Sequence, residues 1–418
     1  MKTVLQISSP LRGGLGWGLS LCFSLFIIVS PALAQVAVRG ETVYTMAGEP
    51  IKNGVVLLKG KTIERVGPSS QVSIPRGYKV MNAKVVTPGL IDAHTVVGLA
   101  GIYNVPHDQM QLETSSPMQP ELRALDAYNP REELVEWVRN LGVTTIHTGT
   151  GPGALASGSS IIVKTLGNTI NEVLVSSNGM VMFTLGASVN QNFRSPGTRS
   201  KSVAMIRAEF LKAQEYKTKI DSANGNPSKL PARDLKLETL VKVLSGEMKA
   251  LFTAQTAPDI MAVLRMSEEF GFKPVLDGAA ESYMLIDEIK KAGVSVILHP
   301  TMVRPGGDTR NVSMETAATL KKAGIPVALQ SGYEGYVPKT RVVLFEAAIA
   351  AANGLSFNDA LATITIDAAR IIGMEKRIGS LEAGKDADVV LYDGDPFEYT
   401  THVCGVIING VVASETCK

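Results

Sequence analysis

The sequence has no excess of charge of either sign and contains very few histidines and cysteines. Its 418 residues include 41 Lys and Arg, 39 Asp and Glu, five His and three Cys. Without residues 1–34, which contain Lys2 and Arg12 but no acid, 39 basic residues balance 39 acidic ones. This balance argues against a nucleic-acid-binding protein, which needs a basic patch or stripe. With 45% hydrophobic and 19% charged residues, the chain is globular and not disordered.

The first 34 residues have the pattern of a Sec-type signal peptide. Lys2 and Arg12 precede an apolar run from Gly16 to Val29, and the small-residue pattern Ala32-Leu33-Ala34 follows. The apolar run is shorter than the ~20 residues that a transmembrane helix needs, and no later stretch reaches that length. We therefore expect cleavage after Ala34 and a periplasmic or secreted mature protein with no membrane association. An uncleaved membrane anchor is the alternative.

Export would permit a disulfide, and two cysteines remain after the expected cleavage. Cys404 and Cys417 lie in a segment that has the pattern of two strands joined by a turn at Asn409-Gly410. Strict pairing across that turn places Cys404 opposite Glu415, two residues short of Cys417. A frayed or bulged hairpin would allow the disulfide, whereas a regular hairpin would leave two free thiols.

Both ends of the mature chain differ from its middle in their pattern of apolar runs and turns. Residues 35–85 and 380–418 contain short β-rich runs separated by turns, which predicts a small composite β-sandwich domain built from both chain ends. Residues 86–379 alternate apolar strand-like runs with amphipathic helices, which predicts an α/β fold with a parallel sheet. Eight such runs favour a (β/α)8 TIM barrel. The predicted strands are 85–94, 143–149, 160–165, 180–186, 250–256, 273–279, 294–300 and 325–331.

Two segments resemble characteristic motifs of the amidohydrolase superfamily. VVTPGLIDAH (85–94), with the following Gly98, resembles the first barrel strand of that superfamily. RIGSLEAGKDADVVLYDGDP (377–396) resembles the return of its chain into the sheet domain, and the preceding ALATITIDAARIIGMEK is similar to the imidazolonepropionase-related branch. The resemblance covers nearly all of residues 36–418. It implies metal-assisted hydrolysis of carbon–nitrogen bonds other than peptide bonds, in cyclic amides or similar small molecules.

Most of the metal ligands that this resemblance implies are missing from the sequence. The superfamily typically has a His-x-His pair ending the first barrel strand, at times a Lys on the fourth, a His on the fifth and sixth, and an Asp on the eighth. His94 fills the first position of the pair, but Val96 occupies the second. Gln255, Gly278 and Gly332 stand where the later ligands are expected, and the fourth strand has no Lys. The sequence therefore predicts a degenerate metal site.

Three residues at predicted strand ends could form a different site. His94, Asp277 and His299 end the first, sixth and seventh strands, and the carboxyl ends of barrel strands meet at one mouth. Two imidazoles and a carboxylate can hold one zinc ion or act as an acid/base set. We predict His94 as a metal ligand and Asp277 and His299 as catalytic residues. For His299, a capped loop histidine before Pro300 is the alternative, and His147 fits a packed barrel residue better than a ligand.

Two further charged residues are interpreted as structural. Asp92 shares a strand face with His94 and in the superfamily is usually structural, and Lys164 fits a buried or lumen-facing cation rather than a ligand.

Two functions remain open. One is a hydrolase of carbon–nitrogen bonds that acts on a small-molecule substrate and binds one divalent metal such as zinc. The other is a catalytically inactive exported barrel that binds a small molecule or a partner protein.

Overall fold

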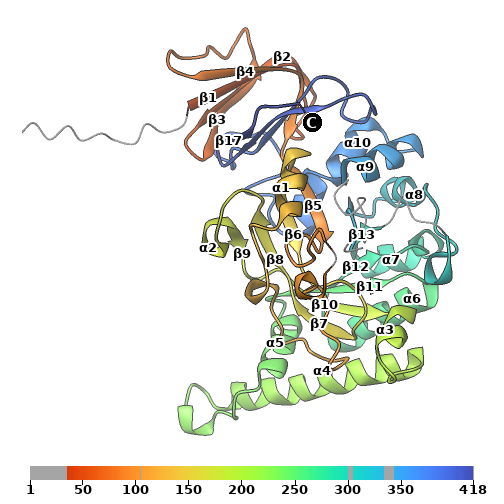
Figure 1. Ribbon diagram of the computed structural model, residues 1–418. Coiled ribbons are helices and arrows are strands. Elements are labelled where there is room, and N and C mark those ends of the chain that lie inside the picture. The colour runs from red at the N-terminus through yellow and green to blue at the C-terminus, as the bar shows by residue number, and fades with distance from the viewer. Residues whose placement is uncertain (1–34, 104, 300–304, 334–342, 418) are drawn as a thin grey trace, which may run out of the picture. The chain divides into compact units, whose positions relative to one another are not determined.

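The computed structural model describes residues 35–103, 105–299, 305–333 and 343–417. These residues form a mixed α/β fold with three sheets (Figure 1). The predicted signal peptide, residues 1–34, lies outside the described residues, so cleavage and export stay predictions. In the described ranges no helix has both the length and the apolar character needed to cross a membrane.

A seven-stranded sheet joins strands from both ends of the described chain. Its order is β17-β16-β15-β4-β1-β2-β3. The strands are β1 (Gln35–Val43), β2 (Ile51–Lys59), β3 (Thr62–Pro68), β4 (Lys79–Pro88), β15 (Val389–Tyr392), β16 (Val403–Ile408) and β17 (Val411–Ser414). One face buries an apolar cluster that includes Val38, Val56 and Val389. A division into domains at residues 85 and 380, and a sandwich of two sheets, stay predictions.

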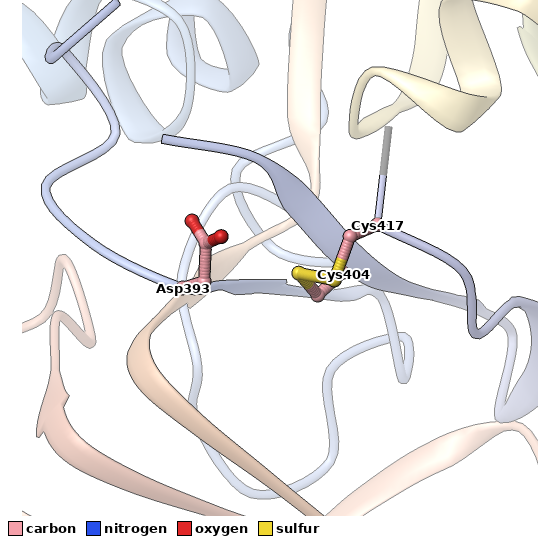
Figure 2. A group of neighbouring side chains, drawn as sticks. All are labelled: Asp393, Cys404 and Cys417. Carbon is pink, nitrogen blue, oxygen red and sulfur yellow. A yellow bond between two sulfur atoms is a disulfide. The ribbon is translucent and has the colours of Figure 1, made fainter. Parts of the chain in front are cut away.

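The hairpin of β16 and β17 carries a disulfide between Cys404 and Cys417. Ile408 pairs with Val411 and Ile407 with Val412, but a bulge then places Val406 opposite Ser414. The extra residue in β17 shifts its later residues by one along the partner strand, so that Cys404 would face Thr416, the neighbour of Cys417. Figure 2 shows the bonded sulfurs close to Asp393. Of the two alternatives that the sequence left open, the structure has the bulged, disulfide-bonded hairpin.

The middle of the chain forms two further sheets. The four-stranded sheet has the order β5-β6-β8-β9, with β5 (Leu90–Thr95), β6 (Val143–Thr148), β8 (Ile161–Lys164) and β9 (Leu174–Ser176). The six-stranded sheet has the order β14-β13-β12-β11-β10-β7. Its strands are β7 (Ala156–Ser159), β10 (Met180–Leu185), β11 (Lys249–Ala254), β12 (Pro274–Gly278), β13 (Ser295–Leu298) and β14 (Val327–Leu329). Neighbouring strands from β10 to β14 are parallel, as are β5 and β6.

The third predicted strand does not run parallel to its neighbours, so this part of the prediction is wrong. β8 is antiparallel to β6, and β7 is antiparallel to β10. The physical reason lies in the connection from β6 to β8: residues 149–160 contain the short strand β7 and no helix. Parallel pairing usually needs a crossover of a dozen or more residues that contains a helix, and this connection has none. The first predicted strand, 85–94, is also divided, because β4 ends at Pro88 and β5 begins at Leu90.

Helices follow most of the parallel strands and cover one side of them. The helices are α1 (Glu133–Asn140), α2 (Ile170–Val173), α3 (Ala187–Asn192), α4 (Arg199–Ser222), α5 (Leu235–Leu244), α6 (Ala257–Phe270), α7 (Ile286–Ala292), α8 (Thr316–Lys322), α9 (Val343–Ala352), α10 (Phe357–Thr363) and α11 (Ile366–Ile371). The sequence signals are clear in α6: the Thr256 side chain accepts a hydrogen bond from the Asp259 backbone, and Gly271 ends the helix in a left-handed conformation. Residues 218–240, taken from the sequence as a polar insertion, are partly helical.

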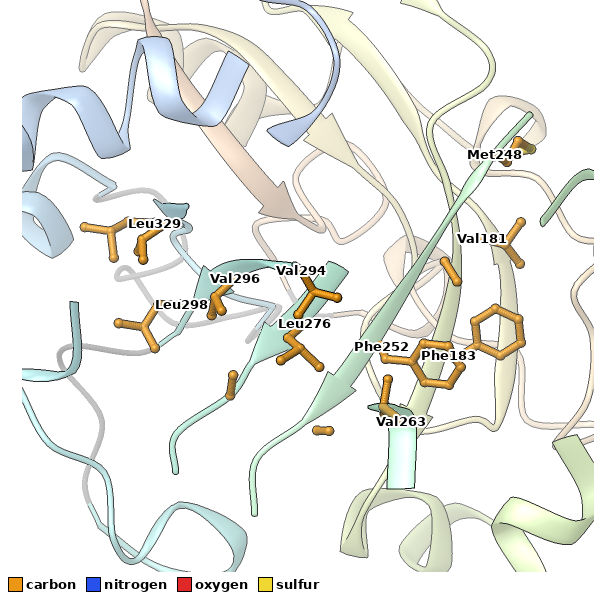
Figure 3. Close-up of a cluster of buried hydrophobic side chains, with 14 of the residues drawn as sticks. Val181, Phe183, Met248, Phe252, Val263, Leu276, Val294, Val296, Leu298 and Leu329 are labelled. Carbon is orange, nitrogen blue, oxygen red and sulfur yellow. The ribbon is translucent and has the colours of Figure 1, made fainter. Parts of the chain in front are cut away.

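Alternate residues of the parallel strands pack on two different clusters. Figure 3 shows the cluster on the helix side, where Phe183 of β10 and Phe252 of β11 stack with ring centroids 4.6 Å apart. On the opposite side, residues from both sheets meet in a second apolar cluster. It includes Ile91, Ile162, Met182, Leu251, Val275, Ile297 and Ala328, from seven strands. The strands of the two sheets therefore share one apolar cluster.

A buried lysine ties β8 to the segment that precedes β15. The Lys164 side chain is 2% exposed, and its Nζ lies 3.0 Å from a carboxylate oxygen of Asp386 and also pairs with Asp388. Asp388 accepts a further hydrogen bond from the backbone of Asn409, at 2.9 Å. Lys164 is thus a buried cation compensated by two carboxylates, in keeping with a structural role.

Replacing Lys164 with Met should destabilise the protein strongly. The variant would keep the side-chain volume but leave Asp388 buried without its cation, which typically costs about 3–5 kcal/mol. The matched control is Lys212→Met, because Lys212 pairs with Glu209 on the surface and its side chain is 60% exposed. That exposed pair should contribute about 0–1 kcal/mol. Urea unfolding of the two variants measures the difference, and equal midpoints would contradict a structural role for Lys164.

Candidate functional site

A cavity of about 330 Å³ lies at the carboxyl ends of several parallel strands. Thr184 ends β10, Thr253 and Gln255 lie at the end of β11, and His299 follows β13. Tyr333, shortly after β14, also lines the cavity. Its size is suited to a small molecule, and the carboxyl ends of parallel strands are where α/β proteins place their ligands.

Two of the predicted site residues meet in the layer next to this cavity. His94 of β5 and Asp277 of β12 are both fully buried, and the His94 Nδ1 lies 2.9 Å from the Asp277 Oδ1. Asp277 is held by two more donors: the Thr253 hydroxyl at 2.5 Å and the Gln330 amide at 2.6 Å. Thr253 itself lines the cavity, so the pair is connected to it by one side chain.

The pair favours a charged imidazole beside a charged carboxylate. Burial alone would raise the pKa of Asp277, but the charge of His94 and the hydrogen bonds from His94, Thr253 and Gln330 lower it below the usual value. Burial would lower the pKa of His94, yet the charge and the hydrogen bond of Asp277 raise it overall. Because Asp277 accepts the Nδ1 hydrogen, the exchangeable proton belongs to Nε2. This Nε2 is buried, and the backbone of Thr150 also acts on the ring and raises the pKa of His94.

Tyr333 connects His94 to the third predicted residue, His299. The Tyr333 ring centroid lies 5.8 Å from that of His94 and 5.3 Å from that of His299. His299 is 2% exposed and lines the cavity, and its backbone amide donates to the Gly278 carbonyl at 3.2 Å. The structure therefore brings His94 and Asp277 into direct contact and places His299 beside the same tyrosine ring. The catalytic roles of Asp277 and His299 stay predictions.

His147 is buried, and both of its ring nitrogens are engaged. Its Nδ1 lies 2.6 Å from the Ala93 carbonyl oxygen, and its Nε2 lies 2.6 Å from the Ser160 hydroxyl. A carbonyl can only accept, so Nδ1 carries a hydrogen. Burial first, and then the nearby charge of His94, lower the pKa of His147 to about 4. These contacts agree with the interpretation of His147 as a packed residue.

Asp92 connects β5 to the residues that follow β14 through hydrogen bonds. Its carboxylate accepts the Ser331 backbone amide at 3.1 Å and also the Ser331 hydroxyl. Burial raises the pKa of Asp92 to about 7, although the two hydrogen bonds from Ser331 act in the opposite direction. Asp92 thus positions the strand that carries His94.

The side chains around the cavity do not fit a catalytic zinc ion, which takes three protein ligands. His94 fits one such ligand, since metal-bound histidines often donate their other ring hydrogen to a carboxylate, as His94 does to Asp277. Over the described ranges, however, the one set of three potential ligand atoms within reach of each other is Asp393, Cys404 and Cys417. Its sulfurs are joined in the disulfide (Figure 2). His94 as a metal ligand therefore stays a prediction.

Sequence reasoning missed the residues that hold the predicted ones in place. Thr253 and Gln330 bind Asp277, and Tyr333 contacts both histidines. The sequence places Gln255 at a strand end where a metal ligand is expected. A signal was available: polar residues that end several parallel strands gather at one edge, so these side chains could have been grouped with Asp277.

The burial of His147 makes a testable contribution to the pH dependence of stability. Its pKa is about 4 in the folded chain and ~6.5 when unfolded, so the unfolded state binds more protons between these values. Its contribution is therefore present above pH ~6.5 and is lost as the pH falls toward ~4, by up to ~3 kcal/mol. We expect urea unfolding at pH 4.5–7 to show a shallower loss of stability for His147→Gln than for the unsubstituted chain. Parallel curves for the two proteins would refute this expectation.

Comparisons with known proteins agree with this architecture. A family profile described as "Amidohydrolase family" matches residues 254–413. Amidohydrolase tasK of Hapsidospora irregularis is 24% identical over 374 residues, which cover 82% of this chain but 38% of that protein. An imidazolonepropionase of Solibacter usitatus is 22% identical over 85% of this chain and 88% of its own length.

Solved structures show the same relationship. An amidohydrolase from Thermotoga maritima superposes with a TM-score of 0.85 and 28% identity, covering 90% of this chain and 99% of its own. A zinc-bound adenosine deaminase from Xanthomonas campestris has a TM-score of 0.54 at 15% identity, over 91% and 92% of the two chains, and so shares the fold alone. From these relationships and the motifs at residues 85–94 and 377–396, the chain belongs to the amidohydrolase superfamily and is related to the imidazolonepropionases.

Proposed function

We propose that this chain is an exported hydrolase of carbon–nitrogen bonds other than peptide bonds, acting on cyclic amides or similar small molecules. The observation that carries the proposal is the buried His94–Asp277 pair next to a cavity of small-molecule size. Superfamily membership supports the reaction class, since relatives include an imidazolonepropionase and a 5-methylthioadenosine/S-adenosylhomocysteine deaminase.

The scaffold proposed for this site is a closed (β/α)8 barrel with a composite sheet domain. Residues from both middle sheets share one apolar interior. At the free edges, Thr95 of β5 and Gly332 after β14 form an isolated parallel bridge, and Ser331 binds Asp92. These contacts lie where the last strand of a barrel would meet the first.

The proposed chemistry uses the proton of His94. The imidazolium would first release its Nε2 proton to solvent, and the neutral ring would then take a proton from a water molecule as the water oxygen bonds to the amide carbon. Asp277 would hold the ring and stabilise the resulting imidazolium. The proton would then pass to the leaving nitrogen as the carbon–nitrogen bond breaks, which yields an acid and an amine. His299, the titratable imidazole that lines the cavity, would bind the substrate and assist the proton transfer.

A specific observation favours a second function. Val96, Gln255, Gly278 and Gly332 replace the ligands that the superfamily uses for its metal ions. A catalytically inactive barrel that binds a small molecule or a partner protein would account for this loss directly, because binding alone requires no ions.

Metal content and hydrolysis of the purified chain distinguish the two functions. We expect ring opening of cyclic amides such as hydantoin and dihydrouracil, with kcat/KM lowered at least ~100-fold in His94→Asn and Asp277→Asn. His402→Asn is the matched control, because His402 is an exposed histidine of the seven-stranded sheet region. Tight binding of these compounds without turnover would favour the inactive barrel. About one zinc per chain, lost in His94→Asn, would instead assign His94 to a metal and contradict the metal-free route.

A further inference from the structure

Asp393, Cys404 and Cys417 bring three potential metal ligands to one point of the seven-stranded sheet. A carboxylate oxygen of Asp393 and the two sulfurs all lie within 4.8 Å of one another. Figure 2 shows the three side chains, which come from the residue after β15, from β16 and from the residues after β17. Two thiolates and a carboxylate are ligands that zinc takes in proteins. The cluster therefore has the composition of a zinc site whose sulfurs are joined in a disulfide.

Strand pairing places these residues together independently of the disulfide. β15 pairs with β16, and the Asp393 backbone donates to the His402 carbonyl at 3.3 Å, two residues before Cys404. β16 pairs with β17 as far as Ser414, three residues before Cys417. These backbone hydrogen bonds do not involve the sulfurs. The three side chains would therefore stay close to each other when the disulfide is reduced.

His402 also orients the carboxylate of Asp393. Its backbone amide donates to Oδ1 at 2.7 Å, and its ring Nδ1 lies 3.0 Å from Oδ2. Each carboxylate oxygen has two lone pairs, so these two contacts leave room for a bond to a cation. Carboxylates that bind metals are usually held by hydrogen bonds of this kind, which fix their orientation. Asp393 is thus already oriented, and the disulfide is the part of the cluster that must open.

A cavity of about 930 Å³ gives solvent access to the cluster. Asp393, Cys404 and Cys417 all line it, together with residues of β1, β2 and β4. Cys417 is exposed and Cys404 is half-buried, so a reductant and an ion can both reach the sulfurs. This cavity and the one beside His299 have no described lining residue in common. The cluster is therefore separate from the proposed active site.

We propose that Asp393, Cys404 and Cys417 form a redox-dependent site for one zinc ion. Two molecules of a thiol reduce the disulfide to two cysteine thiols and are themselves joined in a disulfide. Zinc then displaces both thiol protons and binds two sulfurs and one carboxylate oxygen, with a water molecule as the fourth ligand. Zinc–sulfur bonds of ~2.3 Å place the two sulfurs ~3.8 Å apart, so the disulfide and the ion exclude each other. A small disulfide as oxidant joins the sulfurs again and releases the ion.

Metal binding by the full chain in its two redox states tests the proposal. The reductant is tris(2-carboxyethyl)phosphine, which has no thiol to compete for the ion and takes up the oxygen of one water molecule. We expect the reduced chain to bind about one zinc per chain, at least ~100-fold more tightly than the oxidised chain, and to release it after treatment with glutathione disulfide. Cobalt in place of zinc should give a thiolate-to-cobalt charge-transfer band in the reduced chain alone. Equal zinc binding in the two states would overturn the proposal.

Substitutions separate a built site from a simple pair of thiols. Asp393→Asn keeps the shape of the side chain but replaces a charged oxygen with a neutral amide, so zinc affinity should fall ~10–100-fold. Asp395→Asn is the matched control, because Asp395 is an exposed carboxylate of the same segment outside the cluster. It should bind zinc as the unsubstituted chain does. His402→Ala should weaken binding roughly tenfold, because Asp393 loses the side chain that orients it.

The readouts need no substrate, so this proposal and the proposed function stand or fall separately. Unchanged affinity in Asp393→Asn would overturn the three-ligand site and leave two thiols alone. Loss of the zinc in His94→Asn would assign the ion to the other cavity and would also overturn the proposal. Hydrogen exchange of the reduced, zinc-free chain provides the last check, since loss of protection in β16 and β17 would mean that the ligands are not held together.

Discussion

A buried ion pair between His94 and Asp277 is the constraint on which the arrangement of the cavity depends. Charges removed from water are costly unless they are paired and their remaining hydrogen-bonding positions are filled. Asp277 meets this requirement through His94, Thr253 and Gln330, which come from three other parallel strands or their ends. The carboxylate therefore fixes β5, β11, β12 and β14 relative to each other at their carboxyl ends. A buried polar network of this kind favours one arrangement of the strands.

The residues between the two middle sheets form layers. The His94–Asp277 pair lies at the carboxyl ends, and an apolar layer that includes Ile91, Leu251 and Val275 lies below it. The backbone of Lys164 is paired with that of Thr145, near the start of β6. The Lys164 side chain binds Asp386 and Asp388 beyond the opposite end of that layer. At one end, two carboxylates thus compensate the charge of Lys164. At the other end, the His94–Asp277 pair lies beside the cavity. The apolar layer between them carries the hydrophobic contribution to folding.

The sequence allowed the local features to be predicted, but not the contacts between distant segments. Periodicity and turn residues indicated the strands and helices, and a family motif placed His94 at a strand end. The antiparallel third strand was missed because the apolar pattern of residues 160–165 does not indicate the direction of the strand. The connection 149–160, which contains no helix, does indicate it. His94 and Asp277 are 183 residues apart, and Asp277 and Gln330 are 53 apart. No spacing rule for a single segment connects such residues, so the contacts that Thr253, Gln330 and Tyr333 make with Asp277 and the histidines became visible only in the fold.

The charges at this site can be explained without reference to the ions that the relatives bind. A buried carboxylate needs a cation, and in this chain the cation is the imidazolium of His94 and the neutral donors are Thr253 and Gln330. An imidazole exchanges its proton near neutral pH, whereas a zinc ion lowers the pKa of its bound water directly. A site that depends on imidazole has less power to activate water and gains more from donors aimed at the carbonyl oxygen. Selection of strained or activated cyclic amides over ordinary amides is the substrate preference that such a site would impose.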